Sequence, residues 1–361
     1  MKIISKLKSE FRRFSTRFRR FSTRFLLSPI RDVRVAKAVE PIRGQFPDQL
    51  QSDELVVVGM MRDAELHVES FVKHHLALGA KQIVLLDNGS VDSTVQLASQ
   101  MDQVTLLRCT LPFSKYKYAM RRYLVKTYGQ KCWALAMDID ERFDFPCSQE
   151  ITLKDLLLYL NQEGYTAVTG QMLDLYSDTE HTKWPTTGDD LVQQSCWYDL
   201  ESITTRPLKN RQGRSQHLSA LKHHKGGVRF AGFEMQDLPT LTKFPLLFPS
   251  AGVLPSESSS HNIRGGKLAD ISCLIKHYKF HGKFVEQCQA AVTSESYFRQ
   301  SLEYRQYLHA LESDSELNLK TDRSQKLEYT DQLIDDDFLV VSDAYRSFVQ
   351  QQQGFKSKVA A

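Results

Sequence analysis

Two aspartates, Asp138 and Asp140, follow a segment that otherwise has the composition of a buried strand. Residues 132–137 have strand length and carry no charge. Side chains two positions apart in a strand point the same way, so both carboxylates lie on one face. Carboxylates this close repel one another and lose hydration at the rim of a core, so such a pair usually holds a divalent cation or binds polar substrate groups. The pair therefore predicts Mg²⁺ or Mn²⁺. Two aspartates that merely cap the strand end are the alternative.

A second set of polar residues follows a strand further upstream. Residues 55–61 indicate a first buried strand, residues 64–78 a helix that stops at Gly79, and residues 82–86 a second strand. This order predicts a right-handed parallel βαβ unit, and ligands of open parallel sheets lie beyond the carboxyl ends of the strands. We therefore expect four carboxylates at that edge, Asp87, Asp92, Asp138 and Asp140. Asp92 by itself could also cap the next helix.

These segments together resemble a known family. Arg62-Asp63-Ala64-Glu65, residues 87–94 and residues 138–141 are similar to motifs of the family 2 type glycosyltransferases of the GT-A fold, which use nucleotide-sugar donors. Five further segments are similar to a bacterial branch of that group, namely residues 170–176, 226–229, 241–246, 259–261 and 275–280. The resemblance covers residues 54–310. It implies an α/β fold with a GT-A-like, Rossmann-type open mixed sheet flanked by helices.

The resemblance implies roles for individual residues around a nucleotide-sugar donor. Asp87 would accept a hydrogen bond from the nucleotide base, with Arg62 and Glu65 beside the same pocket. Asp138 would touch the ribose or the metal. Asp140 would be the principal ligand of a Mn²⁺ or Mg²⁺ ion that bridges the diphosphate and stabilises the leaving nucleoside diphosphate. For Arg62 and Glu65 a surface ion pair is the alternative.

Further residues complete the implied donor site. His277 resembles the late histidine that completes the metal site in many GT-A enzymes, with His261 as a rival. A histidine that is hydrogen-bonded in the structure is the alternative for His277. Arg229 and Lys243 could pair with the donor phosphates, or form salt bridges within their loop.

The base that deprotonates an acceptor hydroxyl must be a carboxylate or histidine that reaches the acceptor oxygen. Glu234 and Asp237 follow the Gly-Gly-x-Arg element at residues 226–229, and Asp174 ends another apparent strand. Each of the three could instead be an ordinary surface or capping carboxylate. We favour Asp237 and Glu234 over Asp174.

The N-terminus carries a tandem heptad, because residues 11–17 recur without change as residues 18–24. On a helix, five phenylalanines would form one stripe flanked by arginines, and Glu10 is the single acidic residue before Asp32. A basic helix with an aromatic face is typical of a segment that lies in the membrane interface and is attracted to anionic lipid. We predict such a helix at residues 1–28. A partner-binding helix, a duplication without a role and a nucleic-acid patch are the alternatives. The last is disfavoured because no nucleic-acid-binding domain accompanies it.

Composition agrees with one large α/β core plus peripheral elements. The chain has 361 residues, of which 41% are hydrophobic, and six cysteines without metal-ligand spacing. Such cysteines are typical of a reduced cytosolic protein. The sequence has neither a run of about 20 apolar residues nor a signal-peptide core. We therefore expect a cytoplasmic protein, peripheral at the inner face of the plasma membrane.

We divide the chain into four parts: a basic amphipathic helix at 1–28, a linker at 29–52, a GT-A domain at 53–310 and a helical C-terminal extension at 311–361. Within them, residues 210–227 should form an exposed loop and residues 336–352 a short helix.

The expected function is transfer of a sugar, with inversion, from a nucleotide-diphosphate donor to a hydroxyl of a glycan or lipid-linked acceptor. One alternative is an Asp-x-Asp phosphohydrolase. It is disfavoured because that motif normally continues into a small residue and Thr or Val, whereas Glu141 and Arg142 follow here. The other alternative is a membrane-associated glycan-binding module without turnover.

Overall fold

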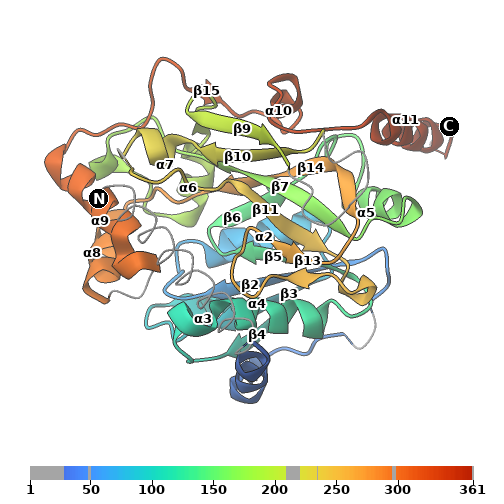
Figure 1. The fold of residues 1–361 in the computed structure, drawn as a ribbon, viewed down its shortest axis with the longest axis horizontal. Coiled ribbons are helices and arrows are strands. Elements are labelled where there is room, and N and C mark those ends of the chain that lie inside the picture. The colour runs from blue at the N-terminus through green and yellow to red at the C-terminus, as the bar shows by residue number, and fades with distance from the viewer. Residues whose placement is uncertain (1–27, 48–49, 209–219, 234, 295–297, 360–361) are drawn as a thin grey trace, which may run out of the picture.

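The computed structural model describes residues 28–47, 50–208, 220–233, 235–294 and 298–359. In this part of the chain one nine-stranded sheet has the order β1-β4-β3-β2-β5-β11-β7-β14-β6. Helices cover the sheet (Figure 1). The predicted basic helix lies outside the described residues, apart from Ser28, and so does Glu234.

Four neighbouring strands of the sheet, β2 to β5, are parallel, as the alternation of strands and helices in the sequence predicts, whereas the edge strand β1 is antiparallel to β4. β2 is parallel to β3 and to β5, and β3 is parallel to β4. The helix α2 ends at Leu78 because Gly79 adopts a left-handed φ of 113° and returns its N–H to the last turn. The elements are β1 (Glu40–Arg43), β2 (Leu55–Met61), α2 (Val68–Leu78), β3 (Gln82–Asp87), α3 (Thr94–Ser99), β4 (Val104–Arg108), α4 (Phe113–Tyr128) and β5 (Trp133–Asp138).

The remaining part of the sheet is mixed, which completes the predicted open mixed sheet flanked by helices. β11 runs antiparallel to β5 and β7, whereas β14 is parallel to β7 and antiparallel to β6. The elements are β6 (Glu141–Asp144), α5 (Leu153–Gln162), β7 (Ala167–Asp174), β11 (Thr242–Leu247) and β14 (Leu268–His277). This is the GT-A-like, Rossmann-type arrangement that the motifs implied.

The central strands are buried on both faces. In β2 and β5, Val57 and Leu135 pack into one cluster with residues of α2, α5 and α11 (Asp343–Val359). Their neighbours Val56 and Ala134 pack into another cluster with α4. Because successive side chains point to opposite faces, this two-sided burial explains why the strands are unbroken apolar runs in the sequence.

An aromatic lobe lies beside the end of β14. It combines α7 (Val228–Ala231), α8 (Phe284–Ser294) and α9 (Phe298–Ser313), and Figure 1 shows α8 and α9 at the left of the view. Its core includes Phe233, Phe280 and Tyr307, which contact one another as rings with centroids 4.8–5.4 Å apart. These edge and stacked contacts fix the position of α9 against the residues that follow β14.

Two expectations about local structure need correction. Residues 222–226, expected in an exposed loop, form β10 (Lys222–Gly226) paired with β9 (Ile203–Pro207), and His224 is buried there against Phe338. The last helix begins at Asp343, not at 336. Before that helix, the backbone N–H groups of Phe338 and Leu339 donate to Leu333 O, and both side chains pack in a buried cluster with Leu333.

The remaining elements are short. They are η1 (His181–Lys183), α6 (Gly188–Gln194), β8 (Trp197–Tyr198), η3 (Pro249–Ala251), β12 (Leu254–Pro255), β13 (Ile263–Arg264), β15 (Gln325–Lys326) and α10 (Gln332–Asp335). Both α10 and α11 lie within residues 311–361, and the division of the chain into four parts stays a prediction. Across the described residues, no helix has the length and apolar composition needed to cross a membrane.

Candidate active site

Several strand ends meet at one place on the edge of the sheet. β14 ends at His277, which is in register with Asp174, the last residue of the parallel strand β7. His277 is also in register with Glu141, the first residue of the antiparallel strand β6. Asp138 ends β5, and Asp140 lies in the turn between β5 and β6. Strand pairing therefore brings together residues that are up to about 140 positions apart in the chain.

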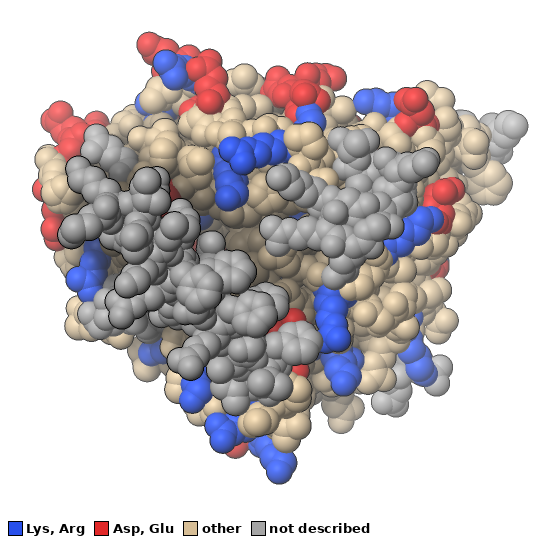
Figure 2. All heavy atoms as spheres, in the orientation of Figure 1, with Lys and Arg blue, Asp and Glu red and all other residues tan. Residues whose placement is uncertain are grey.

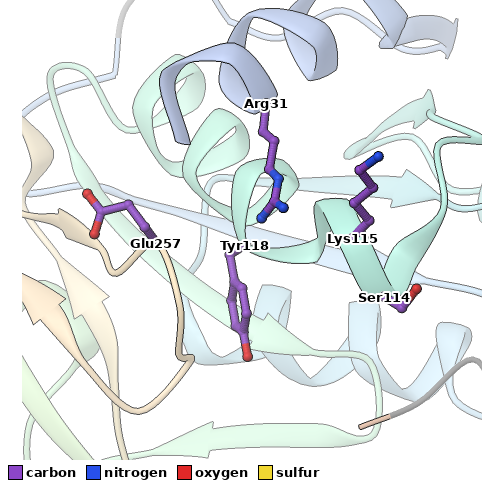
Figure 3. Close-up of a pocket in the computed structure, with 5 residues that line it drawn as sticks. All are labelled: Arg31, Ser114, Lys115, Tyr118 and Glu257. Atoms are coloured by element: carbon purple, nitrogen blue, oxygen red, sulfur yellow. The ribbon is translucent and has the colours of Figure 1, made fainter. Parts of the chain in front are cut away.

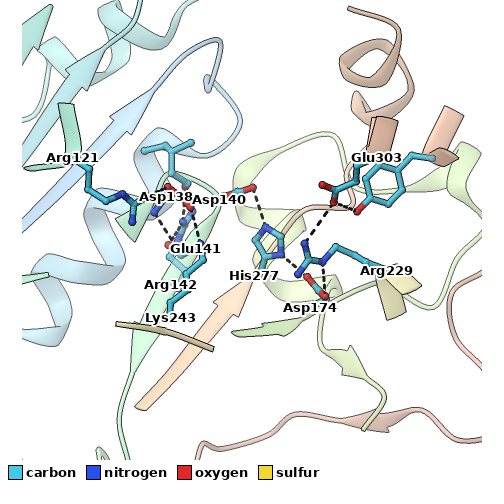
Figure 4. Close-up of polar contacts among 12 residues, drawn as sticks. Arg121, Asp138, Asp140, Glu141, Arg142, Asp174, Arg229, Lys243, His277 and Glu303 are labelled. Carbon is cyan, nitrogen blue, oxygen red and sulfur yellow. Dashed lines mark hydrogen bonds and ion pairs between the residues drawn. The ribbon is translucent and has the colours of Figure 1, made fainter. Parts of the chain in front are cut away.

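Asp140 and His277 face one another across this edge. His277 Nε2 lies 3.1 Å from Asp140 Oδ2, and a ligand atom of Glu141 lies within 4.8 Å of both (Figure 4). The Asp140 side chain is 28% exposed, whereas His277 is buried. Burial opposes ionisation of Asp140, but His277, and more weakly His67 and Lys279, hold its pKa well below the usual range. An anionic oxygen therefore faces an accessible position beside an imidazole.

The other ring nitrogen of His277 is held by a buried carboxylate. His277 Nδ1 donates to Asp174 Oδ1 at 2.5 Å, and Arg229 Nε donates to Asp174 Oδ2 at 2.9 Å. Burial disfavours the charged imidazole, yet Asp140 and Asp174 raise the pKa of His277 to about 9. Burial likewise opposes ionisation of Asp174, but Arg229 and then His277 lower its pKa to about 2. A carboxylate that orients one ring nitrogen is the arrangement found behind metal-binding histidines.

Asp138 points toward two buried cations. Arg121 of α4 forms a close ion pair with Asp138 Oδ1, and Lys243 Nζ of β11 lies 2.7 Å from Asp138 Oδ2. Burial opposes ionisation of Asp138, but Arg121 and then Lys243 hold its pKa far below the usual range. Both oxygens of Asp138 are thus engaged by cations, and Asp138 is not part of the cluster of Asp140, Glu141 and His277.

Glu141 is buried and both of its oxygens have partners. Oε1 accepts from Lys243, and Oε2 accepts from the backbone N–H of Asp138 at 3.0 Å. Burial raises the pKa of Glu141, with Lys243 opposing this. The next residue, Arg142, is also buried and donates to three backbone carbonyls and one hydroxyl, which ties the turn to the start of α2. Asp140 is thus the carboxylate of the cluster most available to a cation.

Asp87 organises the loop that follows β3. Its buried carboxylate accepts the backbone N–H of Gly89 at 3.1 Å and of Ser90 at 3.0 Å. Arg108 Nε lies 3.6 Å away. Gly89 has a φ of 84°, which suits glycine, so this tight turn depends on both residues. Asp87 therefore lies at the predicted strand end, and its role toward a nucleotide base stays a prediction.

Arg62 and Glu65 both take part in surface ion pairs, which is the alternative that the sequence left open. Arg62 Nε lies 3.5 Å from Asp63 Oδ2, with its side chain 58% exposed. Glu65 pairs closely with Lys283 at the start of the aromatic lobe. These pairs do not decide whether either residue contacts a donor.

The predicted base and the rival histidine lie in different surroundings. Asp237 is exposed on the loop after α7, whereas Asp174 is buried between His277 and Arg229. The assignment of the base stays a prediction. His261 Nδ1 lies 3.0 Å from the carbonyl oxygen of Thr242, and burial lowers the pKa of His261 to about 4. Its ring is outside the cluster that contains His277.

Arg121, Glu141, Arg142 and Glu303 take part in this network and were given no role from the sequence. Arg121 could have been noticed, because Arg121-Arg122 interrupts the apolar positions of a helix between Met120 and Leu124. Glu303 Oε1 lies 3.7 Å from Arg229 Nη1 and accepts from the Tyr307 hydroxyl at 2.7 Å. Its segment is a helix with several polar residues, and no pattern distinguishes Glu303 from the others.

A cavity of about 310 Å³ lies elsewhere, beside the start of α4 (Figure 3). Its lining residues are Arg31, Ser114, Lys115, Tyr118 and Glu257. In the part of the chain that the structure describes, no hydrogen bond or ion pair joins them to Asp140 or His277. Because the lining carries charges of both signs, the cavity indicates no particular ligand.

Among known proteins, the chain is similar only to solved structures, and the similarity is weak. No family model and no curated protein matches the chain. Similar solved structures include TarS from S. aureus, at 16% identity over 35% of this chain and 24% of that chain, with a TM-score of 0.28. Another is the mannosyltransferase PcManGT from Pyrobaculum calidifontis in complex with GDP-Man and Mn2+, at 12% identity over 41% and 44%, with a TM-score of 0.25. A third is a UDP-glucose pyrophosphorylase from Acinetobacter, at 11% identity over 74% and 84%, with a TM-score of 0.25. The chain thus spans less than half of the first two structures, and at these TM-scores the likeness identifies no function.

Proposed function

We propose that this chain is a metal-dependent glycosyltransferase. It moves a sugar from a nucleotide-diphosphate donor to a hydroxyl of a glycan or lipid-linked acceptor, with inversion. The observation that carries the proposal is the pair Asp140 and His277 at the carboxyl edge of a parallel sheet, with Asp174 behind the histidine. Ligands of open α/β sheets bind at this edge.

The side chains at this edge fit Mn²⁺ or Mg²⁺. Asp140 supplies a carboxylate oxygen and His277 an imidazole nitrogen, with Glu141 within reach. Carboxylates suit both ions, and the imidazole favours Mn²⁺. When bound, the ion supplies positive charge that stabilises the leaving diphosphate.

The chain's own residues bind the rest of the donor and remove the acceptor proton. The Asp87 loop receives the nucleotide base, and Asp138 with its two cations lies beside the ribose and diphosphate. The acceptor oxygen attacks the anomeric carbon while the bond from that carbon to the diphosphate oxygen breaks. The bonding electrons stay on the phosphate oxygen, and the acceptor proton passes to a base, for which Asp237, Glu234 and Asp174 remain the candidates.

A donor panel tests this function. The full-length protein is incubated with UDP-, GDP- and dTDP-sugars and, separately, with a simple phosphate ester, each with and without Mn²⁺, and released sugar and phosphate are measured. We expect Mn²⁺-dependent release of sugar from at least one nucleotide sugar, because water can replace the acceptor. Cleavage of simple phosphate esters without sugar release would instead identify a phosphohydrolase. No turnover of any donor would leave a binding module.

We propose that residues 1–27, here called the N-terminal arm, bind the surface of an anionic membrane. Residues 1–27 hold nine basic residues and one acidic residue, which is a net charge of +8. Because the whole chain has a net charge of +4, the remaining residues together carry a net charge of −4. On the face in Figure 2, basic and acidic residues both lie along the upper edge. We expect full-length protein to sediment with anionic vesicles at low salt, and substitution of Phe14, Phe18 and Phe21 by Ser to release it.

A truncation provides the complementary measurement. Removal of residues 1–27 should abolish vesicle binding and preserve donor hydrolysis. It spares Ser28, whose hydroxyl accepts from Arg122 at 2.8 Å. If full-length protein does not sediment with anionic vesicles at low salt, the membrane proposal is wrong.

A further inference from the structure

Lys279 lies directly beside the candidate metal site. The backbone N–H of Tyr278 donates to the carbonyl oxygen of Asp140 at 2.9 Å, so Lys279 follows the contact between the end of β14 and the aspartate turn. Its ammonium lies over three aromatic rings, at 5.0 Å from the Tyr304 centroid, 5.4 Å from Tyr307 and 5.6 Å from Phe284. The aromatic lobe therefore holds this cation in place.

Two other cations at this edge, Lys243 and Arg229, already have carboxylate partners. Lys243 contacts Asp138 and Glu141, and Arg229 contacts Asp174 and Glu303. These contacts weaken the earlier expectation that Lys243 and Arg229 pair with the donor phosphates, because both charges are neutralised where they lie.

Lys279 differs from those cations. Among the described residues, no carboxylate lies within 4 Å of its nitrogen. Its charge nevertheless lowers the pKa of Glu303 and, more weakly than His277 does, the pKa of Asp140. Aromatic faces attract an ammonium ion without cancelling its charge, so the cation stays available to an incoming anion.

We propose that Lys279 binds the diphosphate of the donor, with its ammonium on the phosphate oxygens of a nucleotide held at Asp140 and His277. This inference rests on the proposed function and extends it to a residue outside the metal cluster. When the bond between the anomeric carbon and the phosphate oxygen breaks, negative charge grows on that oxygen. An ammonium held there in advance stabilises this charge without rearrangement.

Inorganic pyrophosphate is the direct probe of this subsite. Isothermal titration of the Mn²⁺-loaded full-length protein with pyrophosphate, and then with UDP and GDP, is compared among variants. Lys279→Met should weaken pyrophosphate binding at least about tenfold, because it removes a charge-assisted contact. Lys279→Arg should retain most of the affinity. Lys279→Gln serves as a second neutral variant if Lys279→Met does not fold.

Lys267 offers a matched control. Its nitrogen lies 4.6 Å from the Tyr165 centroid, near the opposite end of β14. Lys267→Met therefore removes a cation–π contact away from the site and should leave pyrophosphate binding unchanged. If the wild type binds no pyrophosphate with Mn²⁺, or if the neutral Lys279 variants bind it as tightly, the proposal is overturned.

This outcome is separable from that of the proposed function. Pyrophosphate binding that depends on Lys279, without sugar release from any donor, supports the phosphate subsite and rejects the glycosyltransferase. Sugar release that Lys279→Met leaves unchanged supports the enzyme and rejects this role for Lys279.

Discussion

Asp140→Asn is expected to lower Mn²⁺-dependent donor hydrolysis by at least about 100-fold while the protein stays folded. Asp140 is the carboxylate of the cluster whose oxygens are least engaged, since both oxygens of Glu141 have partners. The amide can still accept from His277 Nε2 but carries no charge to hold the cation. Removal of one carboxylate also relieves repulsion with Asp138, so we expect the melting temperature to change little.

Asp144→Asn is the matched control for this prediction. Asp144 lies on β6, the strand that follows the turn with Asp140, and it is largely buried. It pairs with Lys276 at 2.8 Å and accepts from Thr330 at 2.6 Å, outside the cluster. Its substitution should reduce stability without changing the metal requirement. The measurements are initial rates across a Mn²⁺ series and melting curves of the same preparations. Asp140→Asn protein with near wild-type rates would exclude Asp140 as the principal metal ligand.

The sequence was sufficient to predict the parallel strands of the sheet and the edge at which these carboxylates lie. β2, β3 and β5 are apolar runs because both of their faces are buried, and Gly79 marks the end of α2 through its backbone conformation. The rule that places ligands at the carboxyl ends of parallel strands then located Asp87, Asp138 and Asp140 at one edge. These inferences use local pattern and topology, which a single sequence contains.

The partners of the site residues could not be predicted in the same way. Lys243 is 105 positions from Asp138, and Arg121 approaches it from a helix on one face of the sheet. Asp174 meets His277 because β7 and β14 pair in one register, and a shift by one residue would point Asp174 to the other face. Register depends on the packing of the whole sheet, so the sequence indicated Asp174 only as a carboxylate at a strand end.

Asp174→Asn is expected to have the largest combined effect on stability and metal binding. Asp174 is 5% exposed and lies between two cations, the His277 imidazolium and the Arg229 guanidinium. Its neutral replacement removes the buried carboxylate shared by both cations and leaves them only Asp140 and the more distant Glu303. This loss should cost about 3–5 kcal/mol of unfolding free energy. Arg229 Nη2 already lacks a hydrogen-bond partner among the described residues, and Glu303 at 3.7 Å from Nη1 is the carboxylate that remains.

The same substitution should weaken Mn²⁺ binding by about 10–100-fold, because the carboxylate that orients His277 loses its charge. The double variant Asp174→Asn with Arg229→Met separates the two effects, since it also removes the uncompensated guanidinium. We expect it to recover part of the stability, measured by denaturant unfolding, and none of the Mn²⁺ affinity, measured by titration. Recovery of both would show that Asp174 acts only through the fold. Unchanged Mn²⁺ affinity with loss of sugar transfer would instead favour Asp174 as the base, because a base is needed for proton removal and not for holding the ion.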